Sequence, residues 1–316
     1  MFIPISKINE LRRNLFKTLE NEVNNLYKHK TKKIKLEKTI HARNNDEANI
    51  SFYTNNLKHL ENISGVKRVY LEIPNSDDTL DMNFNGKYNL NYMVNFLKEA
   101  YEISYAKDYE LIWKWPDIAH DKLIKALNKV RGILNKMHYN IPIMSNAFNG
   151  EYGPYSMNVT NTQTIDSLEN YRILTLSPEL SKKDYEDIIA SCKNPKKVEL
   201  LVQGNVELMK SRYHLLYGNE LKKNYENYLF DRKNNRHPIH KSISGEEIVI
   251  FNDSELSLIE EISHLKNRGF CNFSIDGRYK DDNYYKMIDV YKSALNGNID
   301  KKELLKYSPK NTSGNY

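Results

Sequence analysis

Cysteine and long apolar runs are both scarce in this sequence, and each shortage excludes a class of protein. No apolar stretch approaches the ~20 residues that a helix needs to cross a bilayer, and the start of the chain lacks the apolar core of a signal peptide. The two cysteines, Cys192 and Cys271, cannot form a disulfide framework, and alone they cannot hold a zinc ion or an iron–sulfur cluster. Both fit small buried apolar side chains. We therefore predict a cytoplasmic protein with no membrane contact, no metal site and no cofactor.

Strand-like runs alternate with helical patterns along most of the chain. The eight runs span residues 49–54, 68–73, 110–115, 141–146, 155–160, 171–176, 198–203 and 270–276, with helical candidates over 89–106, 118–137 and 182–192. Strands that alternate with helices predict parallel βαβ units, and eight of them predict a closed (β/α)8 TIM-like barrel of the α/β class. The link over residues 147–154 is too short for an ordinary crossover helix, so the predicted barrel is irregular there.

The two ends of the chain lie outside this alternation. Residues 1–45 predict an N-terminal helical arm: a helix over about 6–30, which Ser6 can cap, and then a basic linker. The barrel itself is predicted over residues 46–309. The polar residues 310–316 predict a disordered tail.

The interval from residue 213 to residue 252 interrupts the alternation a second time. Two stretches in it, 228–231 and 247–251, look extended, and turn-rich residues lie between them. We therefore predict a small β insertion over the barrel mouth, ahead of the last strand.

A basic run follows the predicted helix: residues 28–43 carry seven Lys or Arg against one Glu. Such a run can follow the phosphates of a nucleic acid, because each phosphate that it neutralises releases counterions. Most basic runs are instead solvated linkers or helix ends. The nucleic-acid-binding candidates in this run are Lys30, Lys32, Lys33, Lys35 and Arg43.

Polar residues gather where the predicted strands end, which is the face on which barrels of this class place their function. Reading each strand to its carboxyl end gives the substrate-binding candidates Glu72, Lys114, Asn146, Asn158, Ser177, Glu179, Gln203, Asn205, Asp276 and Arg278, with Asn161 beside them. A polar ring with both charge signs suits a carboxylated or phosphorylated ligand. The alternative is that these groups only hydrogen-bond one another across the barrel mouth.

Arg278 has two interpretations of its own. With Lys114 and Lys280 it predicts a positive pocket, in which the planar guanidinium binds an oxyanion through two hydrogen bonds. In the alternative, Arg278 pairs with Asp276 or Glu179 and fixes the last strand. The two interpretations differ in whether the guanidinium is left for a ligand.

Two local patterns have a structural interpretation beside a functional one. Ser177 and Glu179 flank a proline, which is an ordinary start of a helix, although free amides there can also bind an anion. Trp113 and Trp115 are two residues apart on one predicted strand and therefore share a face. They either fill the barrel or pack under its helices, and stacking on a nucleic-acid base is the functional alternative.

Histidines in and near the insertion offer two further chemistries. At helical spacing Ser211 and His214 could touch as a nucleophile and its base, although no Gly-x-Ser-x-Gly elbow is present. Asp231, His237 and His240 are competent metal ligands. Neither set has the orienting partners that a site requires, so we assign no catalytic residue and no metal ligand.

Four segments carry a resemblance to a known family. Residues 198–214 form an apolar strand that runs through Gln-Gly-Asn into Met-Lys-Ser-Arg-Tyr-His. Residues 155–161 read Tyr-Ser-Met-Asn-Val-Thr-Asn, residues 172–181 include Ser-Pro-Glu-Leu-Ser, and residues 275–280 read Ile-Asp-Gly-Arg-Tyr-Lys. In this order they resemble segments of the peptidase U32 family, in which a Met-x-Ser-x-x-Cys segment follows the strand. His214 stands here in the place of that cysteine.

The resemblance implies an irregular barrel in a family named for collagenase-like peptidases. Its better-understood members support the hydroxylation of RNA bases or of quinone precursors, and some hold an iron–sulfur cluster on four cysteines. Residues 2–13 resemble a segment that long members of the family carry ahead of a second barrel-like half, so this chain looks like that half. The histidine at position 214 departs from the cluster pattern, and we therefore expect a chain without a cluster.

Two functional classes remain for a chain of this kind. In the first, the chain is a cluster-free barrel that either binds RNA or supports a cysteine-bearing U32 partner subunit. The reaction it serves is then a modification of RNA or of a small molecule, of the hydroxylation type. In the alternative, it is an active U32-type peptidase, a collagenase-like hydrolase. We predict the first, because the most reactive group of the family segment is replaced.

Overall fold

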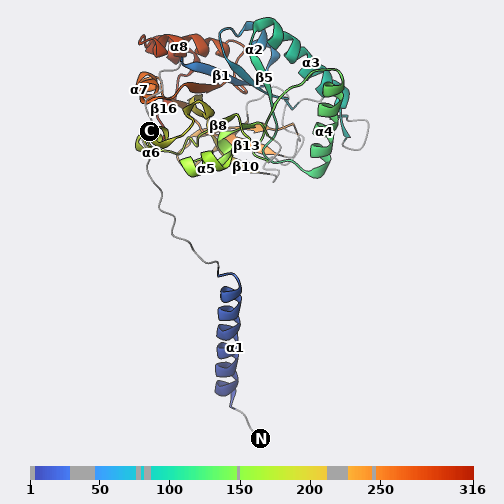
Figure 1. Ribbon diagram of the computed structural model, residues 1–316, viewed down its shortest axis with the longest axis vertical. Helices are drawn as coiled ribbons and strands as arrows, with labels where there is room; N and C mark the ends of the chain where they lie inside the picture. The colour runs from blue at the N-terminus through green and yellow to red at the C-terminus, as the bar shows by residue number, and fades with distance from the viewer. Residues whose placement is uncertain are drawn as a thin grey trace. The chain divides into compact units, whose positions relative to one another are not determined.

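The computed structural model describes residues 4–28, 47–75, 80–81, 87–147, 150–211, 227–243 and 247–316. The chain divides into two compact units, Met1–Thr39 and Ile40–Tyr316 (Figure 1). The predicted boundary between residues 45 and 46 stays a prediction, because residues 29–46 lie outside the described ranges. None of the described helices is long and apolar enough to cross a membrane.

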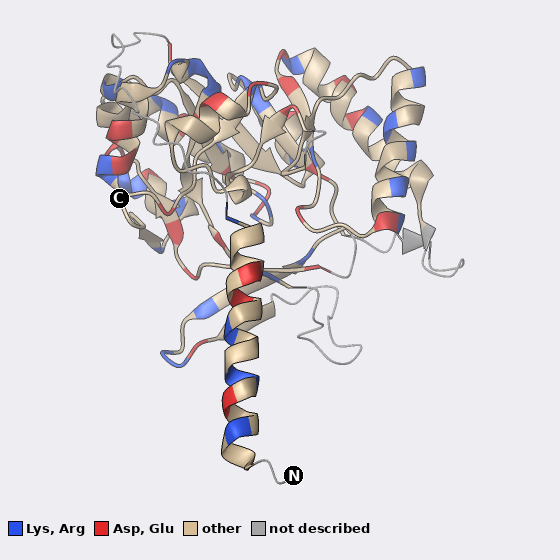
Figure 2. Cartoon of the chain, turned by 60° about the horizontal axis from the view of Figure 1, so that its bottom comes forward, with Lys and Arg blue, Asp and Glu red and all other residues tan. Residues whose placement is uncertain are grey.

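Helix α1 (Ile5–Leu26) is the helix of the first unit. Its apolar residues recur every three or four positions and so form one stripe, while charged residues of both signs occupy other positions (Figure 2). None of its residues is buried. Pro4 precedes the first turn with a φ of −59°, which suits a helix start, and no side chain caps the helix. The predicted cap at Ser6 is therefore wrong, because the helix already begins at Ile5.

Eight parallel strands close into a barrel in the second unit. In order around the barrel they are β1 (Asn49–Thr54), β2 (Arg68–Glu72), β5 (Glu110–Lys114), β6 (Ile143–Met144), β7 (Tyr152–Gly153), β8 (Ile173–Thr175), β9 (Val198–Gly204) and β15 (Asn272–Asp276). Strand β15 pairs with β1 on one side and with β9 on the other, and this double pairing closes the ring. The predicted α/β barrel is therefore confirmed.

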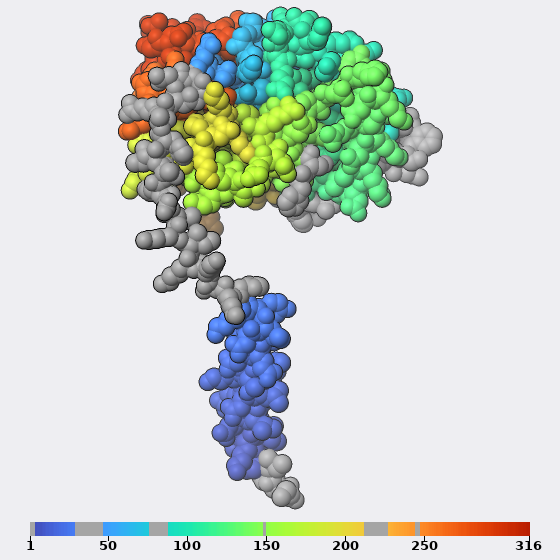
Figure 3. Space-filling model, in the orientation of Figure 1, coloured from blue at the N-terminus to red at the C-terminus, as the bar shows by residue number. Residues whose placement is uncertain are grey.

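Helices lie outside the strands and cover the barrel (Figure 1). They are α2 (Leu57–Asn62), α3 (Leu90–Lys107), α4 (Asp121–Lys136), α5 (Thr162–Ser167), α6 (Lys182–Ser191), α7 (Ile262–Arg268), α8 (Met287–Leu295) and α9 (Lys301–Tyr307), with 3-10 turns at Tyr155–Met157, Pro195–Lys197 and Tyr284–Lys286. Helices α3 and α4 lie side by side along one flank (Figure 3). The start of α6 is fixed by a reciprocal capping box between Ser181 and Asp184.

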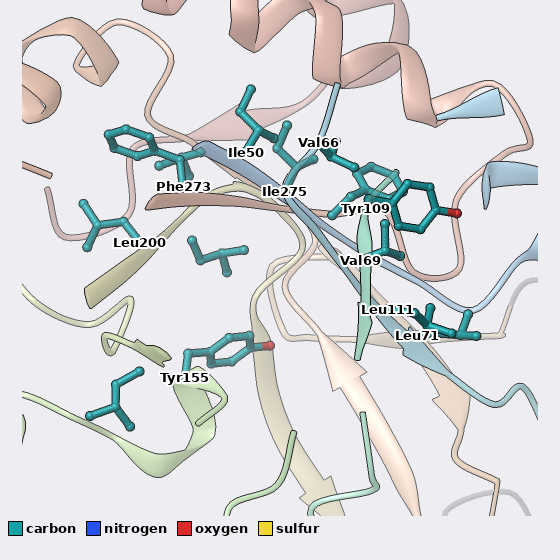
Figure 4. Packing of buried hydrophobic residues seen from close by; sticks show 14 of the residues in the cluster. Ile50, Val66, Val69, Leu71, Tyr109, Leu111, Tyr155, Leu200, Phe273 and Ile275 are labelled. Carbon is teal, nitrogen blue, oxygen red and sulfur yellow. The ribbon is translucent and has the colours of Figure 1, made fainter. Parts of the chain in front are cut away.

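Apolar side chains on the outer faces of the strands pack against the helices. Figure 4 shows part of this core, including Ile50, Val69 and Phe273 on three neighbouring strands. Trp113 and Trp115 belong to the same cluster, so these tryptophans pack under the helices and do not fill the barrel. Burying one such side chain contributes about 1.5–3 kcal/mol, so this layer stabilises the barrel strongly.

The barrel interior is filled by side chains from the inner faces of the strands. Its apolar part is a separate cluster made of Tyr53, Tyr70, Ile112, Met144, Tyr152 and Ile173. Glu199 interrupts the apolar run of β9 because its carboxylate meets partners inside the barrel. It accepts hydrogen bonds from the Tyr70 hydroxyl at 3.0 Å and the Thr175 hydroxyl at 3.1 Å. Arg68 Nη2 lies 3.6 Å from the same carboxylate, so this buried charge is paired.

The fifth strand lies earlier in the chain than the sequence predicted. It is β7, Tyr152–Gly153, whereas the start of the predicted run over 155–160 is a 3-10 turn. Pro154 has no backbone N–H to donate and follows the strand directly, which explains why the pairing stops there. Within 155–160, only Val159 makes a bridge, to Leu176. No helix is present among the described residues between β6 and β7, which agrees with the short link that was predicted.

A second, antiparallel sheet follows β9. Its strands in spatial order are β10 (Glu207–Ser211), β13 (Ile248–Phe251), β12 (Arg236–Lys241) and β11 (Asn227–Phe230); a separate pair is β3 (Leu80–Asp81) with β4 (Lys87–Tyr88). We call the four-stranded sheet the insertion sheet. It confirms the predicted β insertion before the last strand, although its first strand begins earlier than residue 213, at Glu207.

Two short strands extend the barrel sheet at the end of β9. Strand β14 (Glu255–Ser257) pairs antiparallel with β9, and β16 (Asn311–Thr312) pairs parallel with β14. The ring of Tyr316 packs against the main hydrophobic core. The predicted disordered tail over 310–316 is therefore wrong, because strand pairing and a packed tyrosine hold this segment on the barrel.

Gly204, the last residue of β9, occupies a position that excludes a side chain. Its φ is 127°, and a Cβ there would lie 2.6 Å from the carbonyl oxygen of Asp276. The glycine therefore allows the ends of β9 and β15 to come into direct contact.

Gly204→Ala should lower the free energy of unfolding by about 1–3 kcal/mol, because it adds backbone strain and a clash with β15. Gly132→Ala is the matched control: Gly132 lies in α4, and a Cβ there would meet nothing within 4 Å. Alanine should stabilise that position by roughly 0.5–1 kcal/mol. Urea unfolding followed by circular dichroism measures both variants. Equal stability of the Gly204→Ala variant and the wild type would contradict the packing described for this turn.

Candidate functional site

A buried arginine, Arg278, gathers three carboxylates where the barrel strands end. Its Nε donates to Asp276, and its Nη2 donates to Asp276 Oδ2 at 2.6 Å. Its Nη1 lies 2.9 Å from Glu72 Oε2 and 3.0 Å from Glu207 Oε1. Only 2% of the Arg278 side chain is exposed, so the guanidinium is separated from bulk water. Lys114 Nζ lies 3.6 Å from Glu72 Oε2, and we call these five residues the mouth cluster.

The members of the mouth cluster come from different elements. Glu72 and Lys114 end the neighbouring strands β2 and β5, where their Cα atoms are register partners. Asp276 ends β15, and Arg278 follows two residues later. Glu207 instead begins β10 of the insertion sheet. The cluster therefore joins the insertion sheet to three strands of the barrel.

A β-bulge lets the insertion sheet direct two charged side chains to the mouth. Along a regular strand Glu207 and Lys210 would point to opposite faces. The pairing of β10 with β13 shifts register between Glu207 and Met209, and the extra residue changes the alternation. Lys210 Nζ lies 2.5 Å from Glu207 Oε2 and also pairs with Asp117. The bulge thus adds a third cation to the mouth, beside Arg278 and Lys114, and this one comes from the insertion sheet.

Aromatic rings enclose the guanidinium of Arg278. Its Cζ lies 5.8 Å from the ring centre of Tyr53, inside the barrel, and 5.7 Å from that of Phe251 on β13. Tyr279 donates its hydroxyl to Glu72 Oε1 of the mouth cluster at 3.0 Å. The same ring stacks on His240 of β12, with the ring centres 4.0 Å apart. The insertion sheet therefore covers the mouth cluster.

Ion pairing keeps the mouth cluster charged despite its burial. Burial alone would raise the pKa of Glu72, but Lys114 and Arg278 lower this pKa below its usual value. Burial likewise opposes the charge of Glu207, and Arg278 and Lys210 hold its pKa far below the usual range. Because these pKa values lie below those of the unfolded chain, their contribution to stability is present at neutral pH. It is lost as the pH falls through the lowered values.

Glu247, which directly precedes β13, behaves differently. Burial raises the pKa of Glu247 to about 7, with Lys210 lowering it and Asp117 raising it. The region holds five acidic and three basic side chains, namely Glu72, Asp117, Glu207, Glu247 and Asp276 with Lys114, Lys210 and Arg278. Burial is thus the main reason why this carboxyl group binds its proton more tightly than usual, and the neighbouring acids add to it.

Of the three cations expected in the predicted positive pocket, Lys280 and Arg278 line one cavity, and each of them is paired with a carboxylate. The two cations expected at the strand ends, Lys114 and Arg278, are buried and paired with carboxylates. The alternative in which Arg278 pairs with Asp276 and fixes the last strand agrees with the structure. Pairing with Glu179 does not, because Glu179 is exposed and lines a separate cavity. Four predicted site residues, including Glu72, thus meet at the mouth as partners of one another.

Three other predicted residues form a second polar network beside the mouth. Gln203 Nε2 donates to Glu255 Oε2 at 2.6 Å, and Tyr284 donates to the same oxygen at 2.5 Å. Lys280 Nζ donates to Glu255 Oε1 at 2.6 Å and also to the side-chain oxygen of Asn205. Lys280 therefore belongs to this network, and its charge is balanced by Glu255.

The remaining predicted residues belong to neither network. Asn158, Ser177 and Glu179 line a cavity of about 280 Å³, which Glu207 and Lys210 also line. Asn146 is exposed and donates to the backbone oxygen of Asp117 at 3.3 Å. The ten predicted residues are thus brought to one end of the barrel but do not share one site.

One predicted helix start and one predicted site residue lie at the N-terminal ends of helices in the structure or near them. The interpretation of Ser177 and Glu179 as a helix start is wrong: α6 begins at Lys182, and Ser181 caps it. The reason is that Ser181 has an acidic residue three positions on, which completes a capping box. Asn161 caps α5 by accepting a hydrogen bond from the backbone N–H of Thr164 at 2.8 Å.

A cavity of about 610 Å³ adjoins the second network, between the insertion sheet and the neighbouring edge of the barrel. We call it the insertion pocket. Its lining is rich in aromatic rings, amides and bases: Tyr228, His240, Phe251, Tyr279, Tyr284 and Tyr307; Asn205, Asn227, Asn234 and Asn235; Arg236, Arg278, Lys280 and Lys310. Asp253, Glu255 and Asp281 are its acidic members. The pocket therefore offers flat rings and hydrogen-bonding groups to a ligand, with acids and bases mixed.

The histidines of the insertion sheet do not form the metal set considered above. His237 and His240 are three residues apart on β12 and point to opposite faces. His237 Nε2 lies 3.7 Å from Asp231 Oδ2, whereas His240 stacks on an aromatic ring. Asp231 instead accepts backbone hydrogen bonds that close the β11–β12 hairpin, which lower its pKa to about 2. Across the described ranges, no group of three or more His, Cys, Asp or Glu could hold a metal ion.

The serine–histidine pair and the basic run fall partly or wholly outside the described residues. Ser211 ends strand β10, so the helical spacing assumed for it is wrong, while His214 is not described. The nucleic-acid candidates outside the described ranges are Lys30, Lys32, Lys33, Lys35 and Arg43. Their role stays a prediction.

The cysteines do not fit the cluster that some family members hold. Cys192 and Cys271 are both buried. Burial raises the pKa of the Cys192 thiol, which disfavours the thiolate that binds metals. A cluster on four cysteines cannot be held by a chain that has two.

Sequence reasoning missed four charged residues of the mouth: Asp117, Glu207, Lys210 and Glu247. Three of them come from the insertion sheet or its edge, where the bulge interrupts the alternation of side chains between the two faces of the strand. Asp117 lies beyond the end of its strand and gives no periodic signal. The sequence signal for Glu207 is its position three residues after Gly204, the last residue of β9.

One family model and several solved structures are similar to this chain. The model of peptidase family U32 matches residues 84–313. No curated protein matches the chain. Among solved structures, the U32 peptidase Mk0906 is similar at 9% identity and a TM-score of 0.35, over 55% of this chain and 74% of that chain. A thiamine phosphate pyrophosphorylase from Pyrococcus furiosus is similar at 9% identity and a TM-score of 0.35, over 79% of this chain and 93% of that chain.

Arg278→Ala should destabilise the protein by about 3–5 kcal/mol, because it leaves buried carboxylates without their cation. Arg278→Lys should restore only part of the loss, since an ammonium group cannot reproduce the planar fork. Lys58→Ala is the control, because the Lys58–Asp282 pair is of similar length, 2.7 Å, but exposed. Urea unfolding at neutral pH compares the three variants. If Arg278→Ala is no less stable than the control, the structural role of the guanidinium is refuted.

The raised pKa of Glu247 predicts a pH-dependent effect of Glu247→Gln. Folding raises this pKa from 4.5 to about 7, so protonation of Glu247 stabilises the folded state. This contribution is complete below about pH 4.5 and is lost as the pH rises through 7. The variant is neutral at every pH. It should therefore resemble the wild type near pH 5 and exceed its stability near pH 8 by about 1–3 kcal/mol. Urea unfolding at both pH values tests this, and a difference that does not change with pH would contradict it.

Proposed function

Because the chain belongs to peptidase family U32, we propose that it is a barrel of this family that binds RNA in the insertion pocket. In this proposal a cysteine-bearing partner of the same family supplies the modification chemistry. The observation that carries the proposal is the contrast between two places at one end of the barrel. The mouth is filled by paired charges, and the insertion pocket beside it, whose wall Arg278 reaches, has about 610 Å³ of space lined by rings, amides and charged groups.

The state of the mouth argues against catalysis there. A hydrolase needs charged groups that can turn from their resting partners to the substrate. Here Arg278 is paired with Asp276, Glu72 and Glu207. Phe251 of the insertion sheet lies against the guanidinium. A substrate would have to displace this sheet and break buried ion pairs, which is costly. The peptidase alternative is therefore the less supported one.

The aromatic lining of the insertion pocket suits an unpaired base. Single-stranded RNA is recognised largely by stacking its bases on flat side chains. The pocket presents Tyr228 from β11 and the stacked rings of His240 and Tyr279. The His240–Tyr279 stack is nearly parallel, with 11° between the ring planes, and so offers a flat platform.

The polar lining suits the remaining parts of a nucleotide. Asparagine amides can both donate to and accept from the edges of bases. Arg236 is exposed at the start of β12, where its guanidinium can reach a phosphate. The volume of about 610 Å³ falls within the range of ~300–1,000 Å³ that is typical of small-ligand sites. The pocket can therefore take one nucleotide of a longer strand.

The cysteine content supports the proposed partner. The family resemblance implies a four-cysteine cluster in some members, and this chain has two cysteines, both buried. RNA held in the insertion pocket would therefore need a second protein for the reaction. Co-purification from the native cell, with both protein and RNA identified, tests whether such a partner exists.

Tyr228→Ala and Arg236→Gln should both weaken the binding of a fluorescent single-stranded RNA, measured by anisotropy. Loss of a stacking ring costs about 1–3 kcal/mol, which is roughly 5- to 150-fold in affinity. Loss of a phosphate contact should also reduce the dependence of log K on log salt by about 0.7. The tyrosine variant should leave this salt dependence nearly unchanged, because its ring carries no charge.

Lys129→Gln is the control, because it removes one positive charge from the exposed face of α4. It should bind RNA as the wild type does. If all three variants bind equally, RNA binding does not use the insertion pocket. If the wild type releases peptides from denatured collagen and does not bind RNA, the peptidase alternative is supported instead.

A further inference from the structure

One face of the β11–β12 hairpin forms part of the wall of the insertion pocket. Side chains of a strand point alternately to its two faces, so residues two apart share a face. On β12, Arg236, Pro238 and His240 share a face in this way, and all three line the pocket. Tyr228 of β11 lies opposite Pro238 in the antiparallel pairing and lines the pocket as well. We call this side of the hairpin the pocket face.

Phe230 lies on the pocket face, two residues beyond Tyr228. It is opposite Arg236 in the pairing of β11 with β12, and residues in opposite positions point to the same side of a sheet. The side chains agree with this, because Arg236 Cζ lies 5.9 Å from the ring centre of Phe230. Phe230 is 58% exposed. An exposed aromatic ring therefore follows the pocket along the same face of the strand.

The other face of the insertion sheet carries its apolar packing. Ile239 of β12 forms a buried cluster there with Ile248 and Ile250 of β13. Leu229, between the two rings of β11, points to that side by the alternation of the strand. Because the cluster lies on the other face, Phe230 is not part of it.

The turn that joins β11 to β12 carries two exposed cations, Arg232 and Lys233. Its shape is fixed by Asp231, whose carboxylate accepts hydrogen bonds from the backbone N–H of Lys233 at 2.7 Å and of Asn235 at 2.9 Å. Neither Arg232 nor Lys233 forms an ion pair with another of the described residues. The tip of the hairpin therefore presents positive charge directly beyond Phe230.

Two rings in a row, with cations beside them, suit a single strand of RNA. Four-stranded sheets that bind RNA stack two or three bases on aromatic side chains of one face. Rings two residues apart on a strand are separated by about 7 Å, and the bases of an unpaired strand can spread apart to reach both. Stacking accepts any base, since every base has a flat face. Arginine and lysine at the turn can then neutralise phosphates of the same strand.

We propose that the pocket face binds a second unpaired nucleotide beside the one held in the insertion pocket. Its base stacks on Phe230, and its phosphate lies at the cations of the turn. This inference rests on the proposed function, because it takes RNA as the ligand of the insertion pocket. It adds that the ligand is a stretch of at least two unpaired nucleotides, which neither a free nucleotide nor a duplex can replace.

Competition by short oligoribonucleotides tests the second site. Unlabelled oligomers of mixed sequence, one to three nucleotides long, displace the fluorescent single-stranded RNA from the full chain, and anisotropy follows the displacement. For the wild type, the second nucleotide should raise the affinity by about 5- to 150-fold, as expected for one more stacked base. Phe230→Ala should remove most of this gain and leave the affinity for a mononucleotide unchanged. Phe230→Trp should keep the gain, because it retains a flat ring.

Leu229→Ala is the matched control, because Leu229 is the neighbouring exposed apolar residue and points to the other face. It should keep the full gain. If Phe230→Ala also keeps the gain while Tyr228→Ala binds every oligomer more weakly, the second site is refuted and the insertion pocket stands. If no oligomer competes with the wild type, the proposed function fails together with this inference. A duplex that competes as well as the single strand would also overturn the second site.

The cations of the turn give an independent measurement. Arg232→Gln combined with Lys233→Gln should lower the slope of log K against log salt by about 0.7 for each phosphate contact that is lost. Lys125→Gln combined with Lys129→Gln removes the same charge from the exposed face of α4 and should leave the slope unchanged. Equal slopes for the two double variants would overturn the role of the turn in binding phosphate.

Discussion

The burial of one guanidinium sets the arrangement of the barrel mouth. Arg278 is removed from water and is compensated only if Asp276, Glu72 and Glu207 are all in place. These carboxylates come from β15, β2 and the insertion sheet, so the last barrel strand, an early strand and the added sheet are fixed together. Each carboxylate in turn depends on the cation, because an unpaired buried charge is far less stable than a solvated one. The mouth is therefore stable as a complete set and unstable with any member missing.

This constraint also separates the place of binding from the centre of the barrel. Parallel barrels usually bind ligands at the mouth, but here the insertion sheet covers it and the charges there are paired. The polar groups that remain for a ligand lie to one side, around the insertion pocket. Arg278 connects the two regions, since it belongs to the mouth cluster and also lines the pocket. Glu255 and Lys280 line the pocket as well and belong to the network beside β9. The same sheet thus closes one site and forms a wall of another.

Sequence periodicity predicts most strands of the fold, but it predicts only some of the residues that form the site. The bounds of β1 agree with the predicted run because its β-branched and aromatic residues favour a strand. The fifth strand was misplaced because two residues before a proline are too short to give a signal. The rule that function lies at strand ends placed Glu72 at the mouth. Its partner Glu207 was missed, because a bulge is set by pairing between strands and leaves no periodic trace. The paired C-terminal segment was missed for the same reason.

The coupling between Glu207 and Arg278 is the most direct test of this account. A double-mutant cycle with Glu207→Gln, Arg278→Gln and both together isolates the interaction of the insertion sheet with the barrel from other effects of each change. If the buried pair fixes the sheet, the cycle should give a coupling free energy of about 1–3 kcal/mol in urea unfolding. If the effects of the two substitutions add to within about 0.5 kcal/mol, the pair does not hold the sheet on the barrel, and the account of a closed mouth is contradicted.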